Sequence, residues 1–192
     1  MKYGISTLIA VLLAIAYPSS LNAQKLALKS NLVAWATTTP NLGFEMAVDN
    51  QYTVQLFGSY NPFTLKENNK LKHWLVQPEV RWWTKEAFNG HFVGLHLIGG
   101  QFNAGSIKLP FNILPDLDTH RYEGWGIGGG ISYGYQWKLS ERWNLETSLG
   151  LGYARLSYDK FPYEKCSKKI GEEKKNYFGP TKVALSIIYI IK

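Results

Sequence analysis

Residues 41–49 read NLGFEMAVD, a run in which apolar residues alternate with polar or small ones. Side chains two residues apart share one face of an extended strand. The apolar face of this segment would carry Leu42, Phe44, Met46 and Val48. Glu45 stands at the centre of the opposite face, so the two faces of the predicted strand differ sharply in polarity.

The same alternation recurs along the chain in runs of roughly ten residues separated by turn residues, which is typical of membrane β-barrels. We predict strands at residues 25–37, 41–49, 51–60, 72–84, 91–103, 124–139, 142–157 and 180–192. No helical period competes with these strands. The pattern predicts an all-β fold, an eight-stranded antiparallel up-and-down transmembrane β-barrel.

The predicted connections alternate in length. Those at residues 50, 85–90 and 140–141 are short, whereas residues 61–71, 104–123 and 158–179 form longer loops. Only the first outer connection, residues 38–40, is also short. Bacterial outer-membrane barrels have short periplasmic turns, longer outer loops and both chain ends in the periplasm. The order of connections therefore predicts an outer-membrane location.

Aromatic residues recur in pairs at even spacings of eight, ten or twelve residues within single strands. At ~3.3 Å per residue and a tilt near ~40°, eight to ten residues rise roughly 20–25 Å, which matches the apolar band of membrane barrels. We predict two aromatic girdles that contain Tyr52, Tyr60, Trp74, Trp82, Trp125, Trp137, Trp143 and Tyr153. The alternative is a soluble periplasmic carrier of the lipocalin kind, whose apolar face points inward around a ligand.

The N-terminus has the pattern of an export signal. Lys2 supplies the positive end, residues 5–16 form an apolar run too short to span a membrane, and cleavage after Ala23 would leave Gln24 first. We therefore divide the chain into a signal peptide at residues 1–23 and one barrel domain at residues 24–192. Nothing after Gln24 offers ~20 consecutive apolar residues, so only a closed barrel could cross lipid with its backbone groups paired.

With the apolar face outward, five charged residues near the middle of their strands would point inward: Lys29, Glu45, Glu79, Arg81 and Glu146. The interior of an eight-stranded barrel is just wide enough for side chains. Charges held there should pair, because an unpaired buried charge is costly. We predict a charged plug centred on Arg81 with Glu45, Glu79 or Glu146.

Glycines cluster on the predicted inward faces of two strands: Gly126, Gly128, Gly130 and Gly134 on one, and Gly150 and Gly152 on the next. Their missing side chains would make room for bulky residues opposite, such as Trp83 or Phe57. Because no helix follows these glycines, they do not indicate a nucleotide-binding loop. Pro78 falls in mid-strand, where it removes a hydrogen-bond donor, and this predicts a β-bulge.

The residues do not indicate catalysis. Lipid A deacylases of the small-barrel type carry a serine two residues after a histidine, which activates the hydroxyl. Here the residues two after His73, His91, His96 and His120 are Leu75, Val93, Ile98 and Tyr122. Asp116, Asp118 and His120 loosely resemble residues of outer-membrane proteases, although acidic residues after a proline are also ordinary turn formers. A lipid-modifying or proteolytic barrel is therefore the second hypothesis.

Metal binding and cofactors are not predicted, because no second His or Cys stands at ligand spacing from His96. The single cysteine, Cys166, cannot form an internal disulfide. The formal net charge is +7, but no nucleic-acid motif accompanies it, so nucleic acid is not a predicted partner.

Much of the positive charge falls in the last predicted loop, with Lys160, Lys165, Lys168, Lys169, Lys174 and Lys175. Under the predicted topology this loop projects outward, where it would contact lipopolysaccharide phosphates by charge attraction. The alternative is a solvated loop whose charge is offset by Asp159, Glu164, Glu172 and Glu173.

Three stretches resemble a family of unknown function: QPEVRWW at residues 77–83, YEGWG at 122–126 leading to SYGY at 132–135, and YFGPTK at 177–182. Members of that family are predicted to be small outer-membrane barrels of Gram-negative gut and oral anaerobes, often encoded beside fimbrial subunit genes. The resemblance covers nearly the whole mature chain. It implies an outer-membrane location and a link to fimbrial biogenesis, and it implies no reaction.

These observations predict a non-enzymatic, monomeric outer-membrane barrel with a structural or surface-interaction role. Its expected partners are outer-membrane lipid, lipopolysaccharide and fimbrial or other surface proteins.

Overall fold

The computed structural model describes residues 25–63, 70–105, 117, 120–162 and 169–191. The predicted signal peptide and Cys166 lie outside these residues. The described chain forms the strands β1 (Leu26–Asn31), β2 (Asn41–Ala47), β3 (Tyr52–Asn61), β4 (Lys70–Trp83), β5 (Gly90–Gly105), β6 (His120–Lys138), β7 (Trp143–Pro162) and β8 (Gly171–Ile191). One short helix, α2 (Leu32–Ala36), follows β1.

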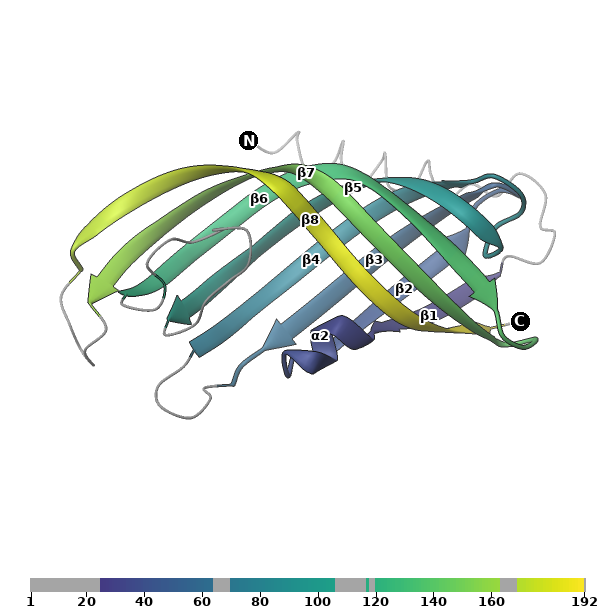
Figure 1. Cartoon of the computed structure of the whole chain (residues 1–192), viewed down its shortest axis with the longest axis horizontal. Helices are drawn as coiled ribbons and strands as arrows, with labels where there is room; N and C mark the ends of the chain where they lie inside the picture. Colours follow the sequence, from purple (N-terminus) through teal and green to yellow (C-terminus); the bar gives the residue numbers. More distant parts are fainter. Residues whose placement is uncertain (1–24, 64–69, 106–116, 118–119, 163–168, 192) are drawn as a thin grey trace, which may run out of the picture.

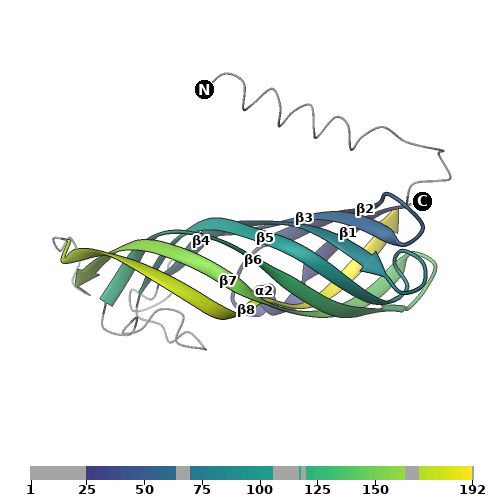
Figure 2. The ribbon, with the colours of Figure 1, turned by 90° about the horizontal axis from the view of Figure 1, so that it is seen from above.

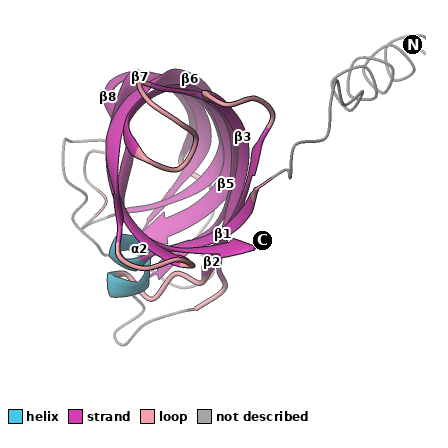
Figure 3. Cartoon of the chain, turned by 90° about the vertical axis from the view of Figure 1, so that its right-hand side faces the viewer, coloured by secondary structure: helices cyan, strands magenta, loops and turns pink. Residues whose placement is uncertain are grey.

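Each strand pairs antiparallel with its neighbour in the sequence, and β8 pairs with β1. The eight strands therefore form a closed hydrogen-bonded ring, which Figure 3 shows from one end and Figure 1 from the side. The prediction of eight antiparallel strands in sequence order is confirmed.

The two faces of the ring differ in polarity as the alternation predicts. On β2, Leu42 and Phe44 point outward and are 48% and 49% exposed, whereas Glu45, which follows Phe44, is completely buried. Large apolar side chains of the other strands are exposed in the same way, among them Leu95, Leu97, Ile127, Ile131, Leu149 and Leu151. Among the described residues, 19 of the buried side chains are polar or charged and 12 are hydrophobic, so the usual arrangement of a soluble protein, with an apolar interior, is reversed.

The ring is much taller on one side than on the other. β1 and β2 have six and seven residues, whereas β6, β7 and β8 have 19, 20 and 21. β1 pairs with β8 only along Ser186–Ile191, and the rest of β8 rises beyond it (Figure 1, Figure 2). The predicted outer loop at residues 158–179 is therefore wrong over most of its length, because β7 continues to Pro162 and β8 begins at Gly171. The predicted loop at residues 104–123 is wrong at its two ends, where β5 reaches Gly105 and β6 begins at His120, and most of the rest of it lies outside the described residues. These extensions carry charged residues on both faces, so they lack the alternation by which a strand is recognised.

The first predicted strand, residues 25–37, is wrong in its second half, which forms α2. The Asn31 side chain accepts a hydrogen bond from Val33 N at 3.0 Å and so caps the helix. The same side chain binds the edge of β8, through Val183 O at 3.1 Å and Leu185 N at 3.2 Å. Asn31 thereby ends the β1–β8 ladder and starts α2. No helix of the described residues is long and apolar enough to cross a membrane.

The predicted bulge at Pro78 is wrong. β4 keeps one register against β3 and β5 on both sides of Pro78, with Leu56 opposite the proline and Glu79 opposite His96. The ladder to β5 simply lacks its pairs at the proline, without an inserted residue. The bulge lies instead in β8, where Lys182 faces Gly150 and Pro180 faces Leu151, which leaves Thr181 as the extra residue.

Candidate functional site

The five predicted interior charges do meet inside the ring. Lys29 comes from β1, Glu45 from β2, Glu79 and Arg81 from β4, and Glu146 from β7. Each is at most 3% exposed. The strand registers align two of them, since Glu45 faces Gln55 of β3 and Gln55 faces Glu79 of β4.

Arg81 stands at the centre of these charges and donates to all three carboxylates. Its Nε and Nη2 each lie 3.0 Å from Glu79 Oε2. Its Nη1 lies 3.0 Å from Glu45 Oε2 and 2.9 Å from Glu146 Oε2, and Nη2 lies 3.2 Å from Glu146 Oε1. All three guanidinium nitrogens are thus used, which fixes the guanidinium plane across the interior.

Two lysines complete the charge balance. Lys29 Nζ lies 2.5 Å from Glu45 Oε2 and 2.9 Å from Glu146 Oε2. Lys182 of β8 forms an ion pair with Glu79. We call these six residues the charge network: Lys29, Glu45, Glu79, Arg81, Glu146 and Lys182. Three cations face three anions, so the network is formally neutral, as the cost of burying charge requires.

Neutral side chains satisfy further carboxylate oxygens. Thr53 Oγ1 donates to Glu45 Oε1 at 2.6 Å, Gln55 Nε2 donates to Glu79 Oε2 at 3.3 Å, and Ser132 donates to Glu79. Every carboxylate of the charge network therefore accepts from at least two side chains. These hydrogen bonds and ion pairs hold the carboxylates in place. A fixed network of this kind is suited to closing the interior of the ring rather than to proton transfer.

Lys182 was not among the residues predicted from the sequence. The bulge at Thr181 reverses the alternation of β8, so that Tyr177 and Lys182 both lie on the inner face. Counting back from the C-terminal end of β8, where Ile190, Ile188 and Ser186 are buried, would have placed Lys182 inward. Thr181 itself approaches His96, with 2.9 Å between Thr181 Oγ1 and His96 Nε2.

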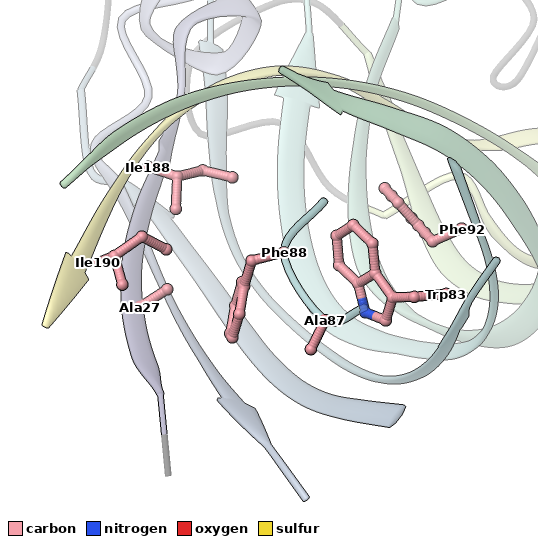
Figure 4. Packing of buried hydrophobic residues seen from close by; sticks show 7 residues of the cluster. All are labelled: Ala27, Trp83, Ala87, Phe88, Phe92, Ile188 and Ile190. Carbon is pink, nitrogen blue, oxygen red and sulfur yellow. The ribbon is translucent and has the colours of Figure 1, made fainter. Parts of the chain in front are cut away.

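An apolar layer lies on the short-turn side of the charge network. Trp83 and Phe92 pack with ring centroids 4.9 Å apart, and Phe88 lies 6.0 Å from Trp83 (Figure 4). Ile188, Ile190, Ala27 and Ala87 complete the cluster. The layer is joined to the network, because the Arg81 guanidinium lies 4.3 Å from the Phe92 centroid and Trp83 Nε1 donates to Thr53 Oγ1 at 3.0 Å.

The turn between β4 and β5 contributes to this layer. Phe88 is only 5% exposed although it lies in a connection, and its φ of 67° is unusual for a bulky residue. Asn144 Nδ2 donates to Phe88 O at 3.2 Å and holds the turn against β7. The turn therefore folds into the end of the ring and covers it.

The inner glycines make room for side chains other than the two predicted. A Cβ on Gly43 would lie 2.7 Å from Lys29 Cγ, and a Cβ on Gly150 would lie 2.8 Å from His96 Cε1. A Cβ on Gly134 would collide with the Phe92 ring. The prediction that the glycines of β6 and β7 face Trp83 or Phe57 is therefore wrong, although Gly43 does lie beside Phe57.

Above the charge network, toward the tall end, the interior holds a cavity of about 160 Å³. Its lining includes Lys29, Gln55, Phe57, Gln77, Lys182 and Ser186. A second apolar cluster of Ala104, Leu117, Tyr122 and Tyr158 lies farther along, among the extended strands. Side chains of the charge network and the apolar layer thus fill the interior on the short-turn side of the cavity, and the second apolar cluster lies on its tall-end side.

The eight predicted girdle residues all lie on the outer face and are between 42% and 61% exposed. Tyr52 faces Trp82 across the β3–β4 ladder, and Tyr60 faces Trp74. The two facing pairs therefore mark two levels of the β3–β4 ladder, eight residues apart. We call the apolar outer surface between these levels the apolar belt.

The tall end carries charge outside the apolar belt. Lys169 pairs with Asp159 at 2.5 Å and lies 3.7 Å from Glu172. Lys160, Lys174 and Lys175 lie on β7 and β8, while Lys165, Lys168 and Glu164 lie outside the described residues. Tyr158 OH donates to Glu173 Oε2 at 3.3 Å, and burial together with this carboxylate raises the pKa of Tyr158 to about 12.

Of the three residues considered for catalysis, the structure describes only His120. Asp116 and Asp118 lie outside the described residues, and His120 begins β6. Among the described residues, no three His, Cys, Asp or Glu side chains are grouped so that they could hold a metal ion.

No curated protein and no solved structure matches the chain. A family model described as "Protein of unknown function (DUF3575)" matches residues 8–191. This range contains every strand of the ring and the whole charge network. The chain therefore belongs to the DUF3575 family of unknown function.

Proposed function

We propose that the protein is a non-enzymatic outer-membrane barrel that spans the bilayer and closes its own interior. The observation that carries the proposal is the reversed polarity of the ring, with exposed apolar residues outside and the neutral charge network inside. An apolar outer face of this kind is stable in lipid. A closed ring also leaves no strand edge with unpaired backbone groups in the bilayer. A ligand carrier of the lipocalin kind needs the opposite arrangement.

In the proposed topology the short turns face the periplasm and the tall end of β5 to β8 faces outward. The charged strands of this end would stand above the lipid and present a rigid surface to other molecules. Surface interaction is therefore the role we assign, and the resemblance to barrels encoded beside fimbrial genes suggests that fimbrial proteins are among the partners. Lipopolysaccharide phosphates are the expected partners of the exposed lysines.

The test of membrane insertion compares boiled and unboiled protein from the outer-membrane fraction on a detergent gel. A folded barrel should migrate differently from the boiled chain. Protein that is released without detergent and migrates identically in both samples would contradict the proposal.

The test of closure is conductance in planar bilayers. The charge network and the apolar layer of Trp83, Phe88 and Phe92 should block ions, so the purified protein should give no steady current. A constant single-channel conductance would contradict the closed interior while leaving membrane insertion intact.

A further inference from the structure

A groove runs along the outer face over β4, β5 and β6. It holds about 440 Å³ and is walled by apolar side chains, chiefly Trp74, Val76, Leu97, Trp125 and Ile127. We call these five residues, together with Gly99 on the floor, the outer groove. It lies within the apolar belt and opens to the outside of the ring.

Gly99 gives the outer groove its depth. It lies between Leu97 and Gln101 on the outward face of β5, and no heavy atom lies within 4 Å of the place where its Cβ would stand. Gly129, the other outward glycine nearby, is different, since its Cβ would lie 3.0 Å from His96 O. Close packing against the backbone therefore explains why residue 129 is a glycine, but it does not explain why residue 99 is one. A glycine costs stability inside a strand, and it often marks a place where a ligand approaches closely.

The polarity of the groove changes along its length. A second hollow adjoins it toward the tall end and shares Trp74, Gln101 and Trp125 with it. There Trp74 Nε1 donates to Gln101 Oε1 at 3.1 Å, and Lys72 faces Asn103 across the ladder. Asn103 Nδ2 donates to Glu123 Oε2 at 3.2 Å, so this carboxylate is already engaged. The outer groove thus ends in two tryptophans, two primary amides, the Lys72 cation and the hydrogen-bonded Glu123 carboxylate.

We propose that the outer groove binds an acyl chain of one lipid A molecule, with Lys72 at the level of its phosphates. The apolar walls and the open floor fit a hydrocarbon chain, and tryptophans at the polar end are typical of the membrane interface. The polar end points toward the proposed outer side, where lipid A is the lipid that carries phosphate next to acyl chains. The inference rests on the proposed membrane function and adds a specific ligand to it.

The test is native mass spectrometry of the protein released from detergent after incubation with lipid A. The wild type should retain one lipid A. Gly99→Leu, which fills the floor, should lose it, whereas Thr147→Leu, which adds a similar side chain to the outer face of β7, should retain it. Lys72→Gln should weaken lipid A binding about tenfold, as expected for loss of one charge-assisted contact.

Several outcomes would overturn the site. Equal lipid A retention by Gly99→Leu and Thr147→Leu would do so, as would equal retention of phosphatidylethanolamine and lipid A by the wild type. A dimer mass that disappears only in Gly99→Leu would assign the groove to a second copy instead. Boiled and unboiled gel samples of each variant separate these results from misfolding. A wild type that does not insert into vesicles contradicts the proposed function, whereas normal insertion with unchanged lipid binding contradicts only the groove.

Discussion

Arg81 holds the three buried carboxylates of the charge network in one place. It contacts Glu45, Glu79 and Glu146 at 2.9–3.2 Å and is completely buried. Replacement by an apolar residue of similar length would leave three carboxylates against two lysines, without the central donor. Removing one partner of a buried ion pair costs about 3–5 kcal/mol of stability, because the remaining charge is left buried without compensation.

We therefore expect Arg81→Met to lower the free energy of unfolding by about 3–5 kcal/mol. Urea unfolding of the vesicle-inserted protein, followed by tryptophan fluorescence, measures this change. Arg155→Met is the matched control, since Arg155 points outward from β7 and is exposed. Similar midpoints for the two variants would mean that the network does not hold the ring together.

Tyr158 gives a prediction for alkaline pH at the tall end. Its pKa is raised to about 12 by burial and by the Glu173 carboxylate, against ~10 in an unfolded chain. Because the folded pKa is the higher one, the contribution of the protonated phenol is complete below pH ~10 and is lost as pH rises toward ~12.

The measurement for Tyr158 is the tyrosinate absorbance of the wild type minus that of Tyr158→Phe. The difference should appear only above pH ~11, and Glu173→Gln should move it to lower pH, because the repelling charge is removed. A difference that titrates at the pH of an ordinary tyrosine would show that Tyr158 is not buried against Glu173.

At the scale of the strand, the bulge in β8 decides which side chains enter the interior. Thr181 is the extra residue between the pairs Gly150–Lys182 and Leu151–Pro180. Deleting Thr181 would make the ladder regular and leave every other pair of β8 in register. The loss would be the contact of Thr181 with His96. Deleting Val183 instead would push Lys182 to the outer face, into the apolar belt, and remove the partner of Glu79.

We expect the Thr181 deletion to fold and to lose about 1 kcal/mol, which is typical of one hydrogen bond. We expect the Val183 deletion to fold poorly, because a one-residue shift exchanges the two faces of a strand. The folded fraction on an unheated detergent gel distinguishes the two variants. Equal folding of both would contradict the assigned register of β8.

The sequence predicted strands well where one face is apolar and the other polar. Glu45, Glu79 and Arg81 could be placed inside for this reason, because their neighbours at odd and even positions differ in polarity. The extensions of β7 and β8 could not be predicted, since Asp159 faces Glu172 and the polar residues there lie on both faces. α2 was missed because it depends on one side chain, Asn31, that caps the helix and also binds β8.

The interior network was predicted with five of its six residues, and the omission has a local cause. Lys182 follows the bulge, and an alternation counted forward from Tyr177 assigns it to the wrong face. From the sequence, one could predict only that the buried charges would pair with opposite charges. Which carboxylate meets which cation depends on the registers of β1, β4, β7 and β8, which the sequence does not specify.

For the whole molecule, the proposed membrane function depends on what surrounds the outer face. Leu95 is 66% exposed on β5 and faces Val80 and Ile131, so it lies between the two girdle levels. Ile170 is 58% exposed but immediately precedes β8, beyond the apolar belt. The two residues are thus alike in exposure and differ in their level along the ring.

If lipid surrounds the belt, Leu95→Arg should lower the free energy of unfolding of the vesicle-inserted protein by about 2–4 kcal/mol, and Ile170→Arg should lower it by about 1 kcal/mol or less. If water surrounds it, both variants should change stability by no more than about 0.5 kcal/mol, the usual effect of a surface substitution. Urea titration of the vesicle-inserted variants measures both values. A large loss at position 95 alone supports a bilayer at that level, and equal small losses at both positions would contradict membrane insertion whatever the interior contains.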